Sequence, residues 1–327
     1  MTGGATPARG KTGFFGQSPL AAAQAQGRKT GMFPPAGAGP LPVPMIRRVG
    51  LTAPTPIIPG YVLGWMLTEG ACGEIYVGEE FAHRQKVAVK ILHPRNEHNS
   101  LERRHLRDEG RIGLRLKQHP NVVRTLRVGK TGRRPYIVME LILGESLREL
   151  LRDGFRAGNR ELHKLAVALA KALQHIHGHG VVHKDVKPDN IMYDRKDGIV
   201  LLDFGFAETR WMAFLHSFRP RLDGSPAYLA PELIRTKRAS PATDLYALGC
   251  TLYEAARGEP PFMGLNHQLT MALQTDLERR PEPLGQFRKD LSTPMERLIM
   301  QLLAKDHGKR FQTAEQVLLE LARMSPG

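Results

Sequence analysis

One stretch of the chain decides the fold: His183-Lys184-Asp185-Val186-Lys187-Pro188-Asp189-Asn190, followed thirteen residues after Asn190 by Asp203-Phe204-Gly205. An apolar run over 199–202 leads into the second motif and predicts a β-strand there. Carboxylates, an amide and lysines are the groups that phosphoryl transfer requires, because carboxylate and amide oxygens bind magnesium and a carboxylate can orient an attacking hydroxyl. Any one of these residues alone would be an ordinary loop charge or helix cap. Their combined spacing makes that alternative a poor explanation.

A phosphate cradle is predicted nearer the N-terminus. The stretch Thr68-Glu69-Gly70-Ala71-Cys72-Gly73-Glu74-Ile75 contains two glycines, which let backbone amides approach phosphate oxygens. Two glycines in a hairpin are more often only a turn, so this stretch by itself is a weak signal. Lys90 ends the apolar run Val87-Ala88-Val89, and from a strand end its ammonium could reach the α- and β-phosphates. The next helix offers Glu109 as the ion-pair partner of Lys90, with Asp108 as the alternative.

In this order, the motifs resemble those of the eukaryotic-type (Hanks-type) protein kinase family. The resemblance implies that Asp185 orients the substrate hydroxyl and accepts its proton, and that Lys187 stabilises the transferred phosphoryl group. It implies that Asn190 and Asp203 hold Mg2+, and that His183 is structural. It also implies ATP as the phosphoryl donor. The residues expected to contact ATP are Gly70, Gly73, Ile75, Ala88, Lys90, Met139, Glu140, Ile142 and Met192.

Features further along the chain resemble the same family. The stretch 224–232, Gly-Ser-Pro-Ala-Tyr-Leu-Ala-Pro-Glu, resembles the end of a kinase activation segment, which seats a peptide substrate. Asp244 resembles the buried helix aspartate that braces the catalytic loop. Arg310 stands where the family has an arginine paired with Glu232. The resemblance therefore covers residues 61–321.

The implied fold is α+β and bilobal: a small antiparallel β-sheet lobe with one helix, over about 58–141, and a larger mainly helical lobe, over about 144–325. The chain agrees with it, because short β-branched runs come first and helical spacing follows Ser146. We expect a protein kinase domain over 58–327. Residues 1–57 are rich in Gly, Ala and Pro and contain no Asp or Glu, which predicts a disordered basic tail.

The resemblance implies phosphorylation of serine and threonine in proteins, including autophosphorylation, since Lys187 and the Ser225-Pro226 pair fit that branch. Two other functions stay open: an ATP-binding pseudokinase scaffold and a small-molecule phosphotransferase. The sequence departs from the family pattern where Thr68 replaces a loop glycine and Lys184 replaces an arginine. Lysine lacks the bidentate fork that grips a phosphate, so control by a phosphorylated activation loop is in doubt.

The net charge of +15 is compatible with acidic protein substrates. Nucleic-acid binding is disfavoured, since the chain has no zinc-finger spacing, helix-turn-helix pattern or RNP-like motif. No apolar run approaches the ~18 residues that span a bilayer, and the N-terminus lacks a secretory apolar region. With two cysteines in all, the sequence predicts a cytoplasmic protein without a membrane partner. A soluble member with a short tail is more typical of bacteria than of animals.

Three features each have an ordinary structural interpretation and a functional one. The apolar segment Trp211–Phe218 either packs on its own domain or docks a partner or a second copy. Gly110 and Gly113 each cost ~1 kcal/mol relative to alanine inside a helix, which predicts a loosely held helix whose position controls the Lys90–Glu109 pair. A run of histidines, His175, His177 and His179, is predicted to be structural or solvated and not a metal site.

Overall fold

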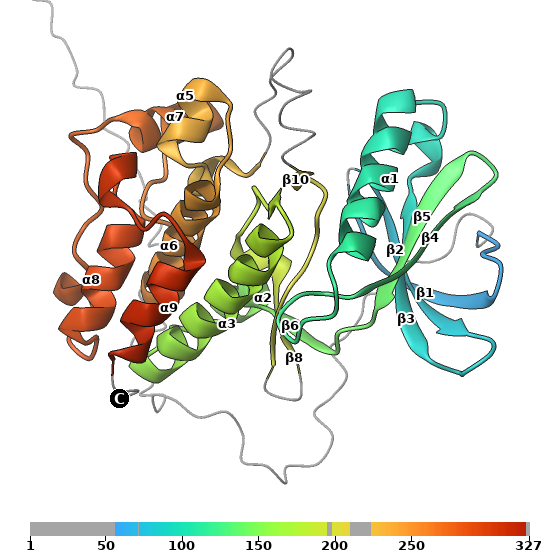
Figure 1. Ribbon diagram of the computed structural model, residues 1–327, viewed down its shortest axis with the longest axis horizontal. Helices are drawn as coiled ribbons and strands as arrows, with labels where there is room; N and C mark the ends of the chain where they lie inside the picture. The colour runs from blue at the N-terminus through green and yellow to red at the C-terminus, as the bar shows by residue number, and fades with distance from the viewer. Residues whose placement is uncertain (1–55, 71, 195–197, 210–223, 325–327) are drawn as a thin grey trace, which may run out of the picture. The chain divides into compact units, whose positions relative to one another are not determined.

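Five strands in the first part of the molecule form an antiparallel sheet with the order β1-β2-β3-β5-β4. The computed structural model describes residues 56–70, 72–194, 198–209 and 224–324 (Figure 1). The strands of the sheet are β1 (Tyr61–Glu69), β2 (Gly73–Glu80), β3 (Lys86–Leu92), β4 (Thr125–Thr131) and β5 (Arg134–Glu140).

The central strand β3 explains where the sheet places its functional residues. Because side chains alternate between the two faces of a strand, Val87, Val89 and Ile91 enter one apolar cluster with Tyr76 and Val138. The opposite face carries Ala88, Lys90 and Leu92. Leu92 packs there against Leu106 of helix α1 (Ser100–Arg115) and Ile137 of β5. The alternation therefore directs Lys90 towards α1.

Helix α1 lies against β4 and β5, and its two glycines are at the contact. A Cβ atom on Gly110 would lie 2.6 Å from Cγ2 of Val128, and one on Gly113 would overlap Oγ1 of Thr125. The prediction of a loosely held helix is therefore wrong. The glycines weaken the helix locally, but they let its backbone approach the sheet more closely than any other residue would.

Gly113→Ala is expected to destabilise the protein by about 1–3 kcal/mol, because the added methyl group forces helix and strand apart. This loss outweighs the ~1 kcal/mol that alanine gains in helix propensity. The free energy of unfolding in urea measures the effect. Gly178→Ala is the matched control, since Gly178 ends helix α3 and has no atom within 4 Å of the added Cβ position. Equal stability of the two variants would contradict the role given to Gly113.

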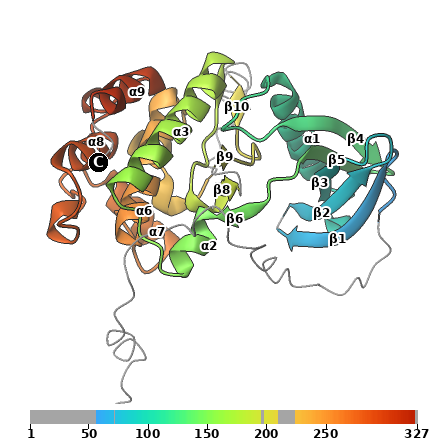
Figure 2. The same ribbon diagram turned by 90° about the horizontal axis from the view of Figure 1, so that it is seen from below.

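The second part of the molecule is mainly helical and is built around α6 (Pro241–Arg257), in which every residue from Ala242 to Ala256 is buried. Helices α3 (Asn159–Gly178) and α8 (Thr293–Leu302) pack on α6, and α9 (Ala314–Ala322) packs on α3 (Figure 2). The other α-helices of this part are α2 (Leu147–Arg152), α5 (Pro231–Thr236) and α7 (His267–Thr275).

Two small sheets hold the motifs that decided the fold. One contains β6 (Gly144–Ser146), β8 (Ile191–Asp194) and β9 (Ile199–Leu201); in the other, β7 (Val181–Val182) pairs with β10 (Glu208–Thr209). The loop 183–190 connects β7 to β8, and the loop 202–207 connects β9 to β10. Strand pairing therefore brings the two loops together.

The predicted α+β architecture is confirmed, with α1 the one α-helix among the sheet strands in the described part of the chain. Within those same ranges, no helix combines the length and the apolar character needed to cross a bilayer. The predicted tail up to Thr55 and the segment Trp211–Phe218 lie outside the described residues.

Candidate active site

Lys90 joins three elements. Its Nζ atom lies 2.6 Å from Oε1 of Glu109 on α1 and 3.2 Å from Oδ1 of Asp203 in the loop after β9. Asp108 instead pairs with Arg111 along the helix surface. Neighbouring helix residues point about 100° apart, so only one of the two acids can face the sheet. The acid that the structure brings to Lys90 is Glu109.

Burial and charge oppose each other in this cluster. Burial by itself would lower the pKa of Lys90, but the carboxylates of Glu109 and Asp203 outweigh it and raise that pKa above its usual value. Burial also opposes ionisation of Asp203, yet the Lys90 ammonium and the Gly205 N–H hold the pKa of Asp203 at about 2. Burial raises the pKa of Glu109, and the contact with Lys90 counteracts the rise. Lys90 and Asp203 are consequently charged at neutral pH.

Asp185 is the centre of the catalytic-loop contacts. Its Oδ2 lies 2.7 Å from Nζ of Lys187 and accepts a hydrogen bond of 2.9 Å from Nδ2 of Asn190. Its Oδ1 accepts one of 3.2 Å from the hydroxyl of Ser225, which in turn accepts one of 2.8 Å from Lys187. Ser225 was not among the predicted site residues. Its place in the Gly-Ser-Pro motif was the available signal.

Asp244, in the first turn of α6, is hydrogen-bonded to the loop 183–190. Its carboxylate accepts hydrogen bonds of 2.8 Å from the backbone N–H groups of His183 and Lys184, and Nε2 of His177 also lies 2.8 Å away. Burial disfavours the charged carboxylate, but the contact with His177 holds the pKa of Asp244 below its ordinary value. Lys184 has φ +69°, in the left-handed region that side chains other than glycine rarely adopt. Asp244 thus fixes a strained turn next to Asp185.

The ring of His183 connects the two loops. Its Nδ1 accepts a hydrogen bond from the N–H of Asp185, so Nε2 is the nitrogen that donates to the carbonyl of Leu202, 3.1 Å away. The centroid of the His183 ring also lies 5.5 Å from the centroid of the Phe204 ring. His183 is fully buried and occupies both nitrogens in these contacts, which agrees with a structural role.

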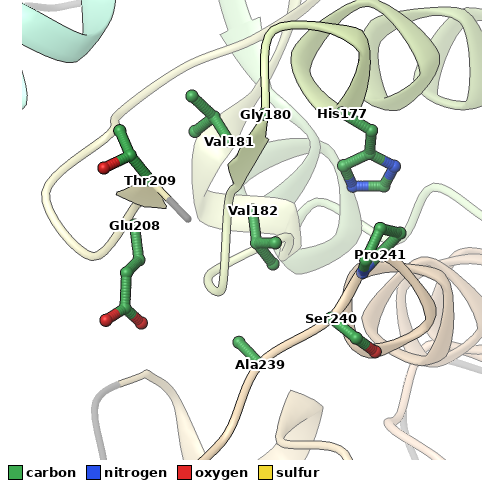
Figure 3. Close-up of a pocket in the computed structure, with 9 residues that line it drawn as sticks. All are labelled: His177, Gly180, Val181, Val182, Glu208, Thr209, Ala239, Ser240 and Pro241. Atoms are coloured by element: carbon green, nitrogen blue, oxygen red, sulfur yellow. The ribbon is translucent and has the colours of Figure 1, made fainter. Parts of the chain in front are cut away.

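Lys184 and Glu208 form a second buried pair, with Nζ and Oε2 3.2 Å apart. The chain itself therefore supplies an acid next to the lysine that replaces the family arginine. Beside Glu208 lies a hollow of about 160 Å3 between β7, β10 and the start of α6 (Figure 3). Neither Lys90, Asp185 nor Asp203 lines it, so the hollow is separate from the candidate active site. Its lining residues are His177, Gly180, Val181, Val182, Glu208, Thr209, Ala239, Ser240 and Pro241.

Several of the residues expected to contact a nucleotide lie on neighbouring strands of the five-stranded sheet. Ile75 on β2 is opposite Lys90 on β3, and Ala88 on β3 is opposite Met139 on β5. Met139 packs against the apolar clusters of both parts of the molecule. Glu140 ends β5, and Ile142 packs on the apolar cluster of the mainly helical part. Met192 lies on β8, and Gly70 and Gly73 border the connection between β1 and β2.

The fold also brings together Glu232 and Arg310, which the family resemblance pairs. Glu232 on α5 pairs with Arg310 through two bonds, of 2.7 Å and 3.1 Å. Arg310 is buried and its guanidinium stacks on the ring of Tyr246 on α6. Bidentate pairing of this kind fixes orientation as well as distance. It secures α5, which follows the segment that contains Ser225.

Comparison with known sequences agrees with this geometry. Residues 61–320 match the family described as Protein kinase domain. The chain belongs to the protein kinase family. This kinase is 31% identical over 291 residues to the serine/threonine-protein kinase PknB of Mycolicibacterium smegmatis, a match that covers 85% of this chain and 45% of that protein. It is 29% identical over 281 residues to PknB of Mycobacterium leprae, with 85% and 45% covered. A probable serine/threonine-protein kinase of Corynebacterium efficiens is 30% identical over 276 residues, with 81% and 41% covered. The chain spans less than half the length of these relatives.

Protein kinases use ATP and typically Mg2+, and the residues of this kinase fit both. Asn190 donates from Nδ2 to the backbone and the side chain of Asp185, which leaves Oδ1 as its possible metal ligand. Asp203 adds a carboxylate, and oxygen atoms are the ligands that Mg2+ prefers. Among the described residues, no three His, Cys, Asp or Glu side chains are grouped as a metal site. A magnesium ion would therefore rely on Asn190, Asp203 and the phosphates.

Proposed function

We propose that this chain transfers the γ-phosphoryl group of ATP to serine and threonine hydroxyls of proteins, including its own. The observation that carries the proposal is the convergence of Lys187, Asn190 and Ser225 on the carboxylate of Asp185. The hydroxyl of Ser225 already bonds to Oδ1, which shows that an alcohol can reach this oxygen. A substrate hydroxyl bound there would be oriented by the same atom.

Each of these residues has a task in such a transfer. Asp185 accepts the hydrogen bond of the attacking hydroxyl and then its proton. Lys187 donates to oxygens of the transferred group, and Lys90, held by Glu109, donates to the other phosphates. Asn190 and Asp203 would hold Mg2+, which neutralises phosphate charge when bound. Catalysis in this scheme comes from positioning and charge, since phosphoryl transfer needs little covalent help from the protein.

A protein substrate is favoured over a small molecule by the anchoring of residues 225–232. The hydroxyl of Tyr228 contacts Glu254 and accepts a hydrogen bond of 2.6 Å from Arg148, while Glu232 is fixed by Arg310. A rigid seat beside Asp185 suits an extended peptide. Transfer is preferred to the pseudokinase alternative because Lys90, Glu109 and Asp203 form one charged cluster, and Lys187, Asn190 and Ser225 contact Asp185 in another.

Transfer of labelled γ-phosphate from MgATP to an acidic and a basic protein acceptor tests the proposal. We expect phosphoserine or phosphothreonine on the acceptor and on the chain itself, and loss of transfer when EDTA removes the metal. Phosphotyrosine alone, or phosphate on small molecules alone, would contradict it. ATP binding without transfer would favour the scaffold.

Substrate preference, cellular location and docking belong to the same proposal. The net charge of +15 supports a preference for the acidic acceptor. Two free cysteines, Cys72 exposed and Cys250 buried, support a cytoplasmic location. Docking of a partner or a second copy through Trp211–Phe218 remains a prediction from the sequence.

A further inference from the structure

Two glutamates border the connection between β1 and β2. Glu69 is the last residue of β1, and Glu74 is the second residue of β2. If this connection cradles phosphates, both carboxylates stand next to groups of like charge, which would weaken nucleotide binding. The neighbours of Glu69 and Glu74 therefore matter for the phosphate cradle.

Both carboxylates have partners, which come from the end of β3 and the start of β5. Glu74 accepts a hydrogen bond of 2.6 Å from Nη2 of Arg134, the first residue of β5, and both side chains are largely buried. Arg134 also donates from Nε to the carbonyl of Leu92, 2.6 Å away. Oε1 of Glu69 lies 2.7 Å from Nε2 of His93, which directly follows β3.

His93 contacts the connection at both ends. Its Nδ1 accepts a hydrogen bond of 3.2 Å from the N–H of Arg95, so Nε2 carries the proton and donates to Glu69. A neutral ring is sufficient for this arrangement. The backbone N–H of His93 donates to the carbonyl of Cys72, 3.1 Å away. His93 thus holds the residue before Gly70 and the residue before Gly73.

The two ends of the connection differ in how firmly they are held. At the β2 end, Gly73 lies so close to the carbonyl of Ile91 that no side chain fits, and the Arg134–Glu74 pair is buried. At the β1 end, the side chain of Glu69 is 47% exposed, and the side-chain contact that the described residues show for it is the one with His93. Backbone pairing of β1 with β2 reaches Glu69 and Glu74, and the N–H of Gly70 donates to the carbonyl of Gly73, so the two ends differ in their side-chain contacts and not in their backbone pairing.

We propose that His93 is a positioning residue for the nucleotide: its ring fixes Glu69, the last residue of β1, before ATP binds. The inference rests on the proposed function and deepens it. Lys90 lies on β3, three residues before His93, so one short segment positions both the lysine and the cradle. A cradle ordered in advance loses less conformational entropy when the phosphates bind.

Two substitutions separate this role from a local structural one. The amide nitrogen of glutamine reaches about the position of Nε2, so His93→Gln keeps the donor to Glu69 and loses the acceptor for Arg95. The amide oxygen of asparagine reaches about the position of Nδ1, so His93→Asn keeps the acceptor for Arg95 and loses the contact with Glu69. His83→Asn is a control, because His83 pairs with Glu80 at the exposed β2–β3 turn.

The dissociation constant of ATP and the hydrogen exchange of residues 66–76 in the nucleotide-free protein are the readouts. We expect His93→Asn to weaken ATP binding and raise the KM for ATP roughly three- to tenfold, with faster exchange and little change in kcat. His93→Gln should recover most of the affinity, and His83→Asn should match the wild type. All variants should unfold at similar temperatures.

Equal ATP affinity and exchange in the two His93 variants would overturn the inference alone, as would recovery by asparagine and not by glutamine. A wild-type chain that binds no ATP and transfers no phosphate would overturn the proposed function together with this inference. The wild-type measurement therefore separates the two failures.

Discussion

Asp185→Asn is expected to lower phosphate transfer about a thousandfold, within the range that loss of a general base produces. The amide has nearly the same shape as the carboxylate, so the fold and the ATP site should remain. It cannot accept the hydroxyl proton, and its NH2 group would face Nζ of Lys187, which lies 2.7 Å from Oδ2 in the wild type. Initial rates of γ-phosphate incorporation at saturating MgATP measure the loss, and the dissociation constant of ATP shows whether binding is preserved.

Asp189→Asn is the matched control in the same loop. Asp189 lies four residues further on, is partly exposed and pairs with Arg148 at 3.2 Å. Loss of an exposed ion pair changes little, so this variant should stay within about twofold of the wild-type rate. If both variants retained activity, Asp185 would not be the proton acceptor. If both lost it, the loop would have been disturbed as a whole.

Asp244→Ala is expected to destabilise the protein by about 3–5 kcal/mol, the usual result of removing one partner from a buried charged network. The substitution takes away the acceptor of two backbone N–H groups and of His177. It also releases the left-handed turn at Lys184 next to Asp185. Urea unfolding gives the free energy, and Asp244→Asn should fall between the alanine variant and the wild type.

The pH dependence of stability gives a second measure of Asp244. Because the folded protein holds the pKa of Asp244 below its ordinary value of 3.8, the unfolded chain binds the proton more readily. The stabilisation is therefore present at neutral pH and is lost as the pH falls below about 3.8. Asp244→Asn should show a smaller loss. Glu320→Ala, which breaks an exposed pair with Arg323, should change stability by less than about 0.5 kcal/mol at any of these pH values.

The sequence predicted the fold and which residues of the candidate site lie together, because the residues of each family motif follow one another closely in the chain. Asp185, Lys187 and Asn190 lie within six residues, so one loop conformation places all three. The sequence named Glu109 as the partner of Lys90 but left Asp108 open as an alternative. The choice depends on the rotation of α1 about its axis, which packing against the sheet determines.

Contacts between distant segments account for what the sequence did not show. Helix propensity made Gly110 and Gly113 look like weak points, but their effect depends on Val128 and Thr125, which belong to a later strand. The pairing of His93 with Glu69 depends in the same way on two strand ends that meet only after folding. Local patterns carry no information about such neighbours.

The close seat of α1 has a mechanical consequence. Where no methyl group fits between Gly113 and Thr125, helix and strand cannot slide past one another, because packed interiors yield very little. Helix α1 and the sheet should therefore move together. Such a motion carries Lys90 and Glu109 as one unit relative to Asp203, which lies in the loop after β9. A push on the exposed Leu101 at the beginning of α1 would then stretch the span from Lys90 to Asp203 and leave the span from Lys90 to Glu109 unchanged. A partner that inhibits phosphate transfer by binding at that side would move helix α1 and the sheet together relative to Asp203. It would not move the helix alone.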